Sequence, residues 1–365
     1  IMDPIKEALT FDDVTLAPKY SSVLPSEVNT SVKLSKNLNL KIPLLSSAMD
    51  TVTESKMAIE IAKAGGIGVI HRNLSINDQI LEIKKVQKKG LVVGAAVGTN
   101  DTELSRAEKI IKCKVDLIVV DTAHGHTKRV ANIIKFIKKK KSNKTTLCAG
   151  NIATAEAAKF LCKLGVDIVK VGIGPGSICT TRLVAGIGVP QLSALLDVKK
   201  GLTKNVKMIS DGGVKFSGDI AKALAAGADA VMVGSMIAGT NEAPGKIIKK
   251  NGKLFKVFRG MGSVGAMNKG SADRYFQKKQ KDSSKYVPEG VEGLIKYKGD
   301  VSKIIFKLIG GLKSSMGYLV SKNVINLRNK SIATSGNYSN FINYINTGSL
   351  RSHIVNPKTG YPVLI

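Results

Sequence analysis

The stretch DIVKVGIGPGSICTTR, residues 167–182, joins a short apolar strand to a loop that carries reactive side chains. Residues 167–171 have the length and the β-branched content of a buried strand. Three glycines and a proline within 172–176 then fix an unusual backbone path, and a thiol, two hydroxyls and a guanidinium follow at 179–182. This pattern predicts a reactive loop at the end of a strand. An ordinary turn with a buried, inert Cys179 is the alternative.

Similar units repeat on both sides of this stretch. Short apolar runs alternate with amphipathic helical segments, which is typical of βα units that build a parallel sheet. We expect eight strands, at residues 43–46, 67–70, 92–97, 116–120, 146–149, 167–171, 207–210 and 230–233. The helical segments before Gly65 and before Gly227 end at these glycines, as helices with a glycine C-cap do. Eight consecutive units predict a (β/α)8 TIM barrel, and an open doubly wound sheet is the alternative.

Polar and reactive residues follow nearly all of these strands, where a barrel of this kind carries its active site. They are Ser47, Met49, His71, Arg72, Asp121, His124, Asn151, Cys179, Asp211, Gly212, Gly213, Gly234 and Ser235. The glycine turns after the seventh and eighth strands suit a phosphate, because glycine lets backbone amides approach an anion. The hydroxyl of Ser177 adds a further donor. We therefore expect a phosphate-bearing ligand.

Composition excludes several classes of protein. The chain has 365 residues, of which 43% are hydrophobic and 36 are glycine, as expected for a large α/β enzyme. The four cysteines have no C-x-x-C spacing, and we find neither a signal-peptide run nor the ~18 apolar residues that span a bilayer. These features predict a reduced, cytoplasmic protein outside the membrane.

The formal net charge of +29 comes mainly from lysines, including the run at 138–141. A basic chain of this kind can bind nucleic acid by neutralising phosphates. The lysines are scattered over the polar faces of the expected helices, however, and lack the interleaved aromatic residues of a base-stacking surface. We interpret them as a solvated surface with no specific nucleic-acid partner.

Several segments of this sequence resemble inosine 5'-monophosphate (IMP) dehydrogenase. They are LTFDDV at 9–14, SSAMDTVTE at 46–54, DTAHGH at 121–126, the cysteine loop, and RGMGS at 259–263. The resemblance runs from about Glu7 to about Leu319 and implies a catalytic barrel over 1–323. GMP reductase shares the cysteine loop. RYF at 274–276 and VPEG at 287–290 look like the mobile flap of the dehydrogenase, expected over about 263–297, which the reductase lacks.

The resemblance implies a covalent mechanism. Cys179 would attack C2 of the hypoxanthine ring, hydride would pass to NAD, and water would hydrolyse the thioimidate to release xanthosine monophosphate. Arg274 would activate that water with help from Tyr275, because a free arginine is a very poor base. Thr181 and Glu289 would form a second proton route.

The resemblance also implies the binding residues. The substrate would meet Ser47, Met49, Ser177, Asp211, Gly212, Gly213, Gly234, Ser235, Phe258, Gly260, Met261, Gly262 and Glu289. Asp121, Thr122, Asn151, Gly172 and Gly174 would face NAD. The carbonyls of Gly174, Gly176 and Cys179 would supply half of a potassium site. A homotetramer is implied as well. We expect no transition metal at His124 and His126, since no third ligand is evident.

Three features depart from the family pattern. The regulatory pair of cystathionine-synthase-like modules is absent near 85–91, where the chain continues directly into the third strand. Phe258 stands where the family usually has a tyrosine that contacts the substrate phosphate. Losing a hydrogen bond to a charged group, about 1.5 to 3 kcal/mol, predicts substrate binding weaker by about one to two powers of ten.

The third departure is the segment 324–365. ATSGNY at 333–338 and HIVNPKTGYPV at 353–363 look like part of a flavin transferase that attaches FMN to proteins. We expect an atypical tail that is too small for a core of its own. If this tail replaces the segment that completes the cation site, potassium activation is in doubt. Two alternatives to the dehydrogenase stay open: a GMP reductase, and a basic nucleotide-binding barrel that has lost catalysis.

Overall fold

A computed structural model describes residues 7–328 without a gap, together with the backbone of 332–334, 341–343, 350–355 and 362–364. Eight parallel strands form a closed barrel in which neighbours in sequence are neighbours in space, and the last strand pairs with the first. They are β4 (Leu44–Ser46), β5 (Ile67–Ile70), β6 (Val93–Val97), β7 (Leu117–Asp121), β8 (Thr146–Ile152), β9 (Ile168–Val171), β10 (Lys207–Asp211) and β11 (Ala230–Val233). The predicted TIM barrel is confirmed, and the open sheet is wrong.

The predicted strand ends differ from the observed ones mainly at the site. β7 and β10 each include one more residue, Asp121 and Asp211, and β8 continues through Asn151 to Ile152. These three polar residues were expected in the loops after the strands. They instead belong to hydrogen-bonded strands, which hold them more rigidly than a loop does.

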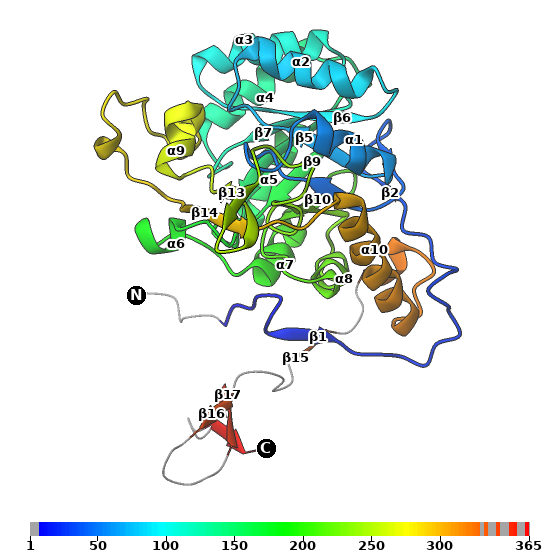
Figure 1. Ribbon diagram of the computed structural model, residues 1–365. Coiled ribbons are helices and arrows are strands. Elements are labelled where there is room, and N and C mark those ends of the chain that lie inside the picture. Colours follow the sequence, from blue (N-terminus) through cyan, green and yellow to red (C-terminus); the bar gives the residue numbers. More distant parts are fainter. Residues whose placement is uncertain (1–6, 329–331, 335–340, 344–349, 356–361, 365) are drawn as a thin grey trace, which may run out of the picture.

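Helices surround the barrel (Figure 1). They are α1 (Ser55–Lys63), α2 (Ile76–Gln87), α3 (Asp101–Lys112), α4 (Lys128–Lys140), α5 (Ala155–Lys163), α7 (Gln191–Gly201), α8 (Ser217–Ala225) and α10 (Val301–Tyr318). Gly65 and Gly227 follow α1 and α8 with φ of +96° and +117°, as expected for glycines past a helix end. α10 packs against both α8 and α1 and so closes the ring.

The lysine-rich surface follows from these helices. α4 buries Val130, Ile134 and Ile137, while its last turn carries Lys138, Lys139 and Lys140. Cations at this end of a helix interact favourably with the helix dipole. The lysine run at 138–141 is therefore accounted for by a helix end that faces solvent on its polar side.

A short hairpin covers the N-terminal end of the barrel. It consists of β2 (Val32–Lys33) and β3 (Asn39–Leu40), and the residues between them bury Leu34 and Leu38. The hydroxyl of Ser35 lies 2.7 Å from that of Thr146, at the start of β8. The opposite end, where the strands terminate, is left for a ligand site.

A long insertion separates β11 from α10. Three antiparallel strands form its base, β12 (Ile248–Lys250), β13 (Lys253–Arg259) and β14 (Glu292–Lys296). The flap is defined as the residues between β13 and β14, 260–291; it contains α9 (Val264–Ala266), the π-helical η1 (Met267–Ser271), and the 3-10 turns η2 (Ala272–Tyr275) and η3 (Ser283–Lys285). Figure 1 shows α9 beside the barrel. The flap was expected over about 263–297, and β14 occupies the end of that range.

The connection between α2 and β6 spans only residues 88–92, as expected without the regulatory modules. Beyond α10, Val324 and Leu327 of α11 (Val324–Leu327) are buried in the barrel's core cluster. β15 (Ile332–Thr334) pairs antiparallel with β1 (Val14–Leu16). β16 (Phe341–Asn343), β17 (Leu350–Val355) and β18 (Pro362–Leu364) form a separate small sheet. The start of the segment predicted as a tail therefore packs on the barrel.

The motifs at 333–338 and 353–363 fall partly outside the described residues, since 335–340 and 356–361 are not among them. The division of the chain at 323 stays a prediction. In the part of the chain that the structure describes, no helix combines the length and the apolar character needed to cross a membrane. All four cysteines are free thiols.

Close contact between α1 and β5 depends on Gly68. A Cβ there would lie 2.5 Å from the Cα of Ala58, which is a backbone atom that cannot move aside easily. We expect Gly68→Ala to lower the free energy of unfolding by about 1–3 kcal/mol, measured as a lower melting temperature by circular dichroism. Gly310→Ala is the matched control: Gly310 lies within α10 with nothing within 4 Å of the new Cβ, and it should be neutral or stabilising. Equal melting temperatures for the two variants would contradict this packing argument.

Candidate active site

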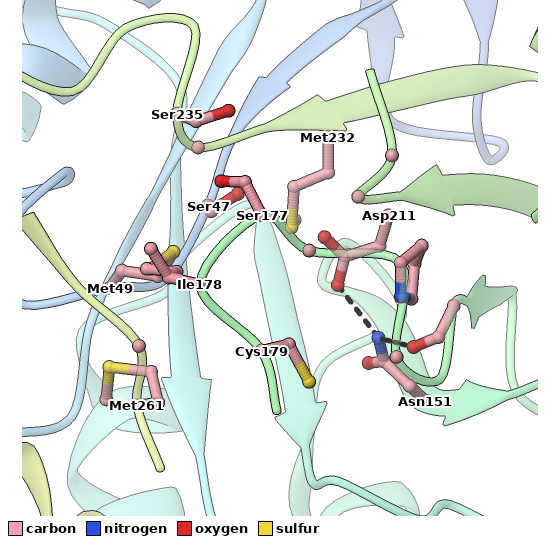
Figure 2. A pocket seen from close by; sticks show the side chains of 18 of the residues that line it. Ser47, Met49, Asn151, Ser177, Ile178, Cys179, Asp211, Met232, Ser235 and Met261 are labelled. Atoms are coloured by element: carbon pink, nitrogen blue, oxygen red, sulfur yellow. Dashed lines mark hydrogen bonds between the residues drawn. The ribbon is translucent and has the colours of Figure 1, made fainter. Parts of the chain in front are cut away.

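A pocket opens at the C-terminal ends of the barrel strands and brings together most of the predicted site residues (Figure 2). Its lining includes Ser47, Met49, Asp121, Asn151, Gly172, Gly174, Gly176, Ser177, Cys179, Asp211, Gly212, Gly213, Gly234, Ser235, Phe258, Gly260, Met261, Arg274, Tyr275 and Glu289. These residues come from six of the barrel strands or the loops that follow them, and from β13 and the flap. They are far apart in sequence, and only closure of the barrel makes them neighbours.

The cysteine loop depends on its glycines. Gly172 and Gly174 have φ of +150° and +87°, which side chains rarely adopt, and a Cβ at Gly172 would lie 2.0 Å from the carbonyl oxygen of Asp211. The backbone N–H of Cys179 donates to the carbonyl of Gly176 at 3.1 Å. This path carries Cys179 from the end of β9 to the pocket.

Cys179 is partly exposed, and its thiol lies 3.2 Å from the hydroxyl of Thr181. A second cysteine shows what the inert alternative looks like. Cys148, in β8, is fully buried, and burial raises the pKa of its thiol to about 12. Cys179 is instead a thiol beside a hydroxyl in an open pocket, where it can act as a nucleophile.

Serine hydroxyls and glycines gather in another part of the pocket. Figure 2 shows Ser47, Ser177 and Ser235 there. A Cβ at Gly234 would lie 3.3 Å from the hydroxyl oxygen of Ser47, so these two residues are in close contact. Gly212 and Gly213 have φ of +90° and +80°. Hydroxyl donors beside a glycine backbone form a suitable cradle for a phosphate.

A buried lysine forms the floor of the pocket. Lys170 is 2% exposed, and its ammonium nitrogen lies 2.9 Å from a carboxylate oxygen of Asp121 and 2.5 Å from one of Asp211. It also donates to the side-chain oxygen of Asn151, whose amide donates at 2.9 Å to Asp211. Burial disfavours the ammonium, but the two carboxylates outweigh that effect and raise the pKa of Lys170. The lysine therefore stays charged.

Lys170 was not among the residues predicted from the sequence. One signal was available: a single lysine stands in the otherwise apolar β9. A lysine is almost never fully buried unless it is paired, so its place in a buried strand predicts carboxylates nearby.

The flap contributes five residues to the pocket lining, and Arg274 is the one that pairs with the barrel. The guanidinium of Arg274 forms an ion pair with Asp121, and Ala123 donates its backbone N–H to the carbonyl of Arg274 at 3.1 Å. Burial raises the pKa of the Asp121 carboxyl, but Arg274 and Lys170 together hold it well below its usual value. The same ion pair outweighs burial at Arg274 and raises the pKa of its guanidinium. Asp121 is thus a carboxylate shared between the barrel and the flap.

The far end of the flap runs beside the cysteine loop. The backbone N–H of Thr180 donates to the carbonyl of Glu289 at 3.0 Å, and the backbone N–H of Glu289 donates to the carbonyl of Gly262 at 3.0 Å. Cys179 and Gly290 form an antiparallel bridge. The flap therefore contacts the site at both ends.

Comparison with known proteins shows which family this barrel belongs to. The sequence model of the IMP dehydrogenase / GMP reductase domain matches residues 8–353. The chain belongs to this family. The match extends beyond Leu319, where the resemblance was expected to end.

Three relatives of the chain are named inosine-5'-monophosphate dehydrogenase. The protein of Borreliella burgdorferi is 47% identical over 88% of this chain and 92% of its own length. That of Cryptosporidium parvum is 45% identical over 91% and 94%. That of Bacillus subtilis is 38% identical over 95% of each.

Three residues predicted for the family's site do not line the pocket. Thr122 is 1% exposed, and its hydroxyl donates to the carbonyl of Gly150 at 2.7 Å. Thr181 reaches the site only through the Cys179 thiol. Gly262 lies under Tyr275, whose ring carbon would be 2.8 Å from a Cβ there. Gly262 therefore acts here by making room for the tyrosine.

The rings of His124 and His126 lie edge to face. Their ring centroids are 6.4 Å apart with the rings at 71°, and His126 also packs on Phe160 at 4.6 Å. Burial lowers the pKa of His124. Across the ranges that the structure describes, no group of three or more histidine, cysteine, aspartate or glutamate side chains could hold a metal.

We expect Lys170→Met to lower the free energy of unfolding by about 3–5 kcal/mol at pH 8, because it leaves Asp211 without its cation. Chemical denaturation followed by circular dichroism measures this change. In the wild type the lowered pKa of Asp121 contributes stability that is fully present above about pH 4. This contribution is lost progressively as the pH falls from there toward the pKa of the folded state. In the variant a proton can relieve the unpaired buried charge, so the deficit should be smaller at pH 5 than at pH 8.

The control for this prediction is Lys170→Arg, which keeps the positive charge and should be less destabilising than Lys170→Met at pH 8. A deficit of the same size for Lys170→Met at both pH values would show that lost packing, and not unpaired charge, is its cause.

Proposed function

We propose that this protein oxidises inosine 5'-monophosphate to xanthosine 5'-monophosphate with NAD as the hydride acceptor, a step in guanine nucleotide synthesis. The observation that carries this proposal is one pocket that holds both Cys179 on its glycine loop and Arg274 with Tyr275 on the flap. Family membership and relatives named as the dehydrogenase support it.

The parts of the pocket match the parts of the substrate. Ser177, Ser235 and Ser47, with the glycines beside them, would hold the phosphate. Asp211 would accept hydrogen bonds from the ribose diol, since one carboxylate can accept from two hydroxyls. Met49, Met261 and Glu289 would contact the base. In this arrangement C2 of the purine would lie toward Cys179.

The thiolate of Cys179 would add to C2, and C2 would lose a hydride, which takes two electrons from the ring. NAD, when bound, would be the acceptor of this hydride. The cysteine is then joined to the ring as a thioimidate. Water adds to C2, its proton is taken up by the enzyme, and the thiolate leaves, which releases the oxidised nucleotide and restores Cys179.

Asp121 and Asn151, with Gly172 and Gly174, would face the dinucleotide, and their polar groups suit its ribose hydroxyls. In this structure Asp121 already pairs with Arg274. The dinucleotide and the flap guanidinium would therefore compete for one carboxylate. This competition supports a reaction in two phases. Oxidation would occur with the flap displaced from the pocket, and hydrolysis would occur with Arg274 paired to Asp121.

The residues proposed for hydrolysis are Arg274 and Tyr275, with Thr181 and Glu289. The raised pKa of Arg274 keeps its guanidinium protonated, so its main contribution would be to orient water and stabilise the developing hydroxide. Tyr275 stands beside it; burial raises the pKa of its phenol, and the guanidinium partly opposes that effect. Thr181, 3.2 Å from the thiol, and Glu289 would offer a second path for the proton.

The remaining expectations rest on family resemblance. The carbonyls of Gly174, Gly176 and Cys179 would contribute to a potassium site, although that of Gly176 also accepts a hydrogen bond from Cys179. A homotetramer and a cytoplasmic location are proposed on the same basis. The free cysteines are compatible with a reducing compartment.

A GMP reductase is the second candidate, because the family model covers both enzymes. The flap with Arg274 and Tyr275 favours the dehydrogenase, since a reductase has no hydrolytic step for these residues. A basic nucleotide-binding barrel without catalysis would bind the substrate but produce no NADH.

The decisive assay incubates the protein with inosine monophosphate and NAD and follows NADH absorbance. We expect NADH formation by the wild type and none by Cys179→Ala, with the covalent nucleotide adduct detected by mass spectrometry in the wild type alone. Cys162→Ala is the matched control, because this cysteine lies in α5 outside the pocket and its loss should leave turnover unchanged. NADPH oxidation with guanosine monophosphate would identify the reductase, and binding without any redox change would indicate the inactive barrel.

Phe258, in β13, lines the pocket and is 6% exposed. A hydroxyl added to its ring would therefore lie at the pocket and not in bulk solvent. We expect Phe258→Tyr to lower the KM for inosine monophosphate by about one to two powers of ten, through one hydrogen bond to the phosphate. Steady-state kinetics at saturating NAD measure the change. Phe258→Leu is the control, since it adds no donor and should not lower KM; an unchanged KM in the tyrosine variant would refute the expectation.

A further inference from the structure

The turn that presents Arg274 is held from outside the pocket by residues that take no part in the proposed chemistry. Asp273 directly precedes Arg274 in η2. Arg72, on the loop after β5, donates from Nη1 to one carboxylate oxygen of Asp273 at 2.9 Å. Asn100, which caps α3, donates from Nδ2 to the other oxygen at 3.0 Å. Two barrel loops thus hold both oxygens of one flap carboxylate.

This contact is well enclosed. Arg72 is 6% exposed, and the side chain of Asp273 is 13% exposed. Gly98 lies against the pair: a Cβ there would be 2.8 Å from Cζ of Arg72 and 2.9 Å from a carboxylate oxygen of Asp273. The missing side chain at Gly98 makes room for the guanidinium and the carboxylate to meet. An ion pair in such an enclosed place is screened less by solvent than a surface pair.

The rest of the flap has few such attachments. Between residues 260–291 and the barrel, all of which are described, two ion pairs are formed: Arg72 with Asp273, and Asp121 with Arg274. The side chains of Phe276, Lys278 and Lys279 are exposed, and the flap's own apolar cluster contains only Met267, Ala272 and Tyr286 as buried members. Adjacent residues of η2 therefore carry both charged contacts to the barrel.

We propose that Arg72, Asp273 and Asn100 form a latch that sets how much of the time the flap is closed, and that Arg72 and Asn100 are positioning residues for the water-addition step. The latch rests on the proposed function. Arg274 pairs with Asp121 only when the flap is closed. A stronger latch therefore favours hydrolysis, and a weaker latch leaves Asp121 free for the dinucleotide. The latch touches neither substrate nor dinucleotide and acts only through the position of Arg274.

Three variants weaken the latch in different ways. Asp273→Asn keeps the shape but removes the charge, and Arg72→Gln removes its main donor. Asn100→Asp keeps an oxygen to accept the N–H of Glu103 at the start of α3, yet replaces the donor to Asp273 by a repelling carboxylate. Lys279→Gln is the control, because it removes a charge from an exposed flap residue outside the latch.

The first measurement needs no activity. Hydrogen–deuterium exchange of the peptide over residues 272–277 reports the opening of η2. Losing one charged hydrogen bond corresponds to about a tenfold increase in the open population, and we expect exchange about tenfold faster in each latch variant. Lys279→Gln should exchange like the wild type. Unchanged exchange in Asp273→Asn and Asn100→Asp would overturn the latch.

The second measurement separates the two phases of the reaction. On rapid mixing with inosine monophosphate and NAD, the latch variants should keep the rate of the NADH burst, while steady-state turnover falls about tenfold and the Cys179 adduct accumulates. Arg72→Gln combined with Asp273→Asn should be little worse than either alone, because both remove one interaction. A parallel loss of burst and turnover would overturn the positioning role.

The two proposals fail in distinguishable ways. If the wild type forms no NADH from inosine monophosphate, the proposed function is wrong, and the exchange measurement still decides whether the latch exists. If the wild type is active and exchange does not respond, only the latch is wrong.

Discussion

The burial of the Lys170 ammonium between two carboxylates is the constraint on which the site depends. A charge buried inside a barrel is tolerated only where opposite charges satisfy it. Asp121 in β7 and Asp211 in β10 do so from opposite sides of β9, the strand of Lys170. Each carboxylate is thereby oriented at the strand ends, and Lys170 helps to hold the pKa of Asp121 below its usual value. The lysine thus fixes the relative positions of the two groups proposed to bind the dinucleotide and the substrate ribose.

Asp121 also connects this floor to the flap. Its second partner, Arg274, belongs to a segment inserted between the eighth strand and the helix that closes the ring. One carboxylate that pairs with a barrel cation and a flap cation fits the proposed two phases, in which the flap guanidinium would leave and return. Asp273, the residue before Arg274, contacts Arg72 and Asn100, and the proposed latch would act on those two phases through these contacts.

Much of this architecture could be predicted from the sequence. Apolar runs located all eight strands, mostly within a residue of their observed ends, because strands buried on both faces read as continuous apolar segments. Cys179 was identified because glycines and a proline at fixed positions dictate a loop. Lys170 was missed, since a lone polar residue in an apolar strand has no local partner in sequence. Thr122 was expected to face NAD, and in the structure its hydroxyl donates to the carbonyl of Gly150.

Local periodicity and motifs of a few residues were enough to predict the barrel, the reactive loop and the family from the chain alone. Which charges meet is settled only when the chain folds. Lys170 and Asp121 are 49 positions apart in the chain, and Arg72 and Asp273 are 201 positions apart. Burial strengthens such contacts by removing water, and no local pattern in the chain records which side chains will share that environment.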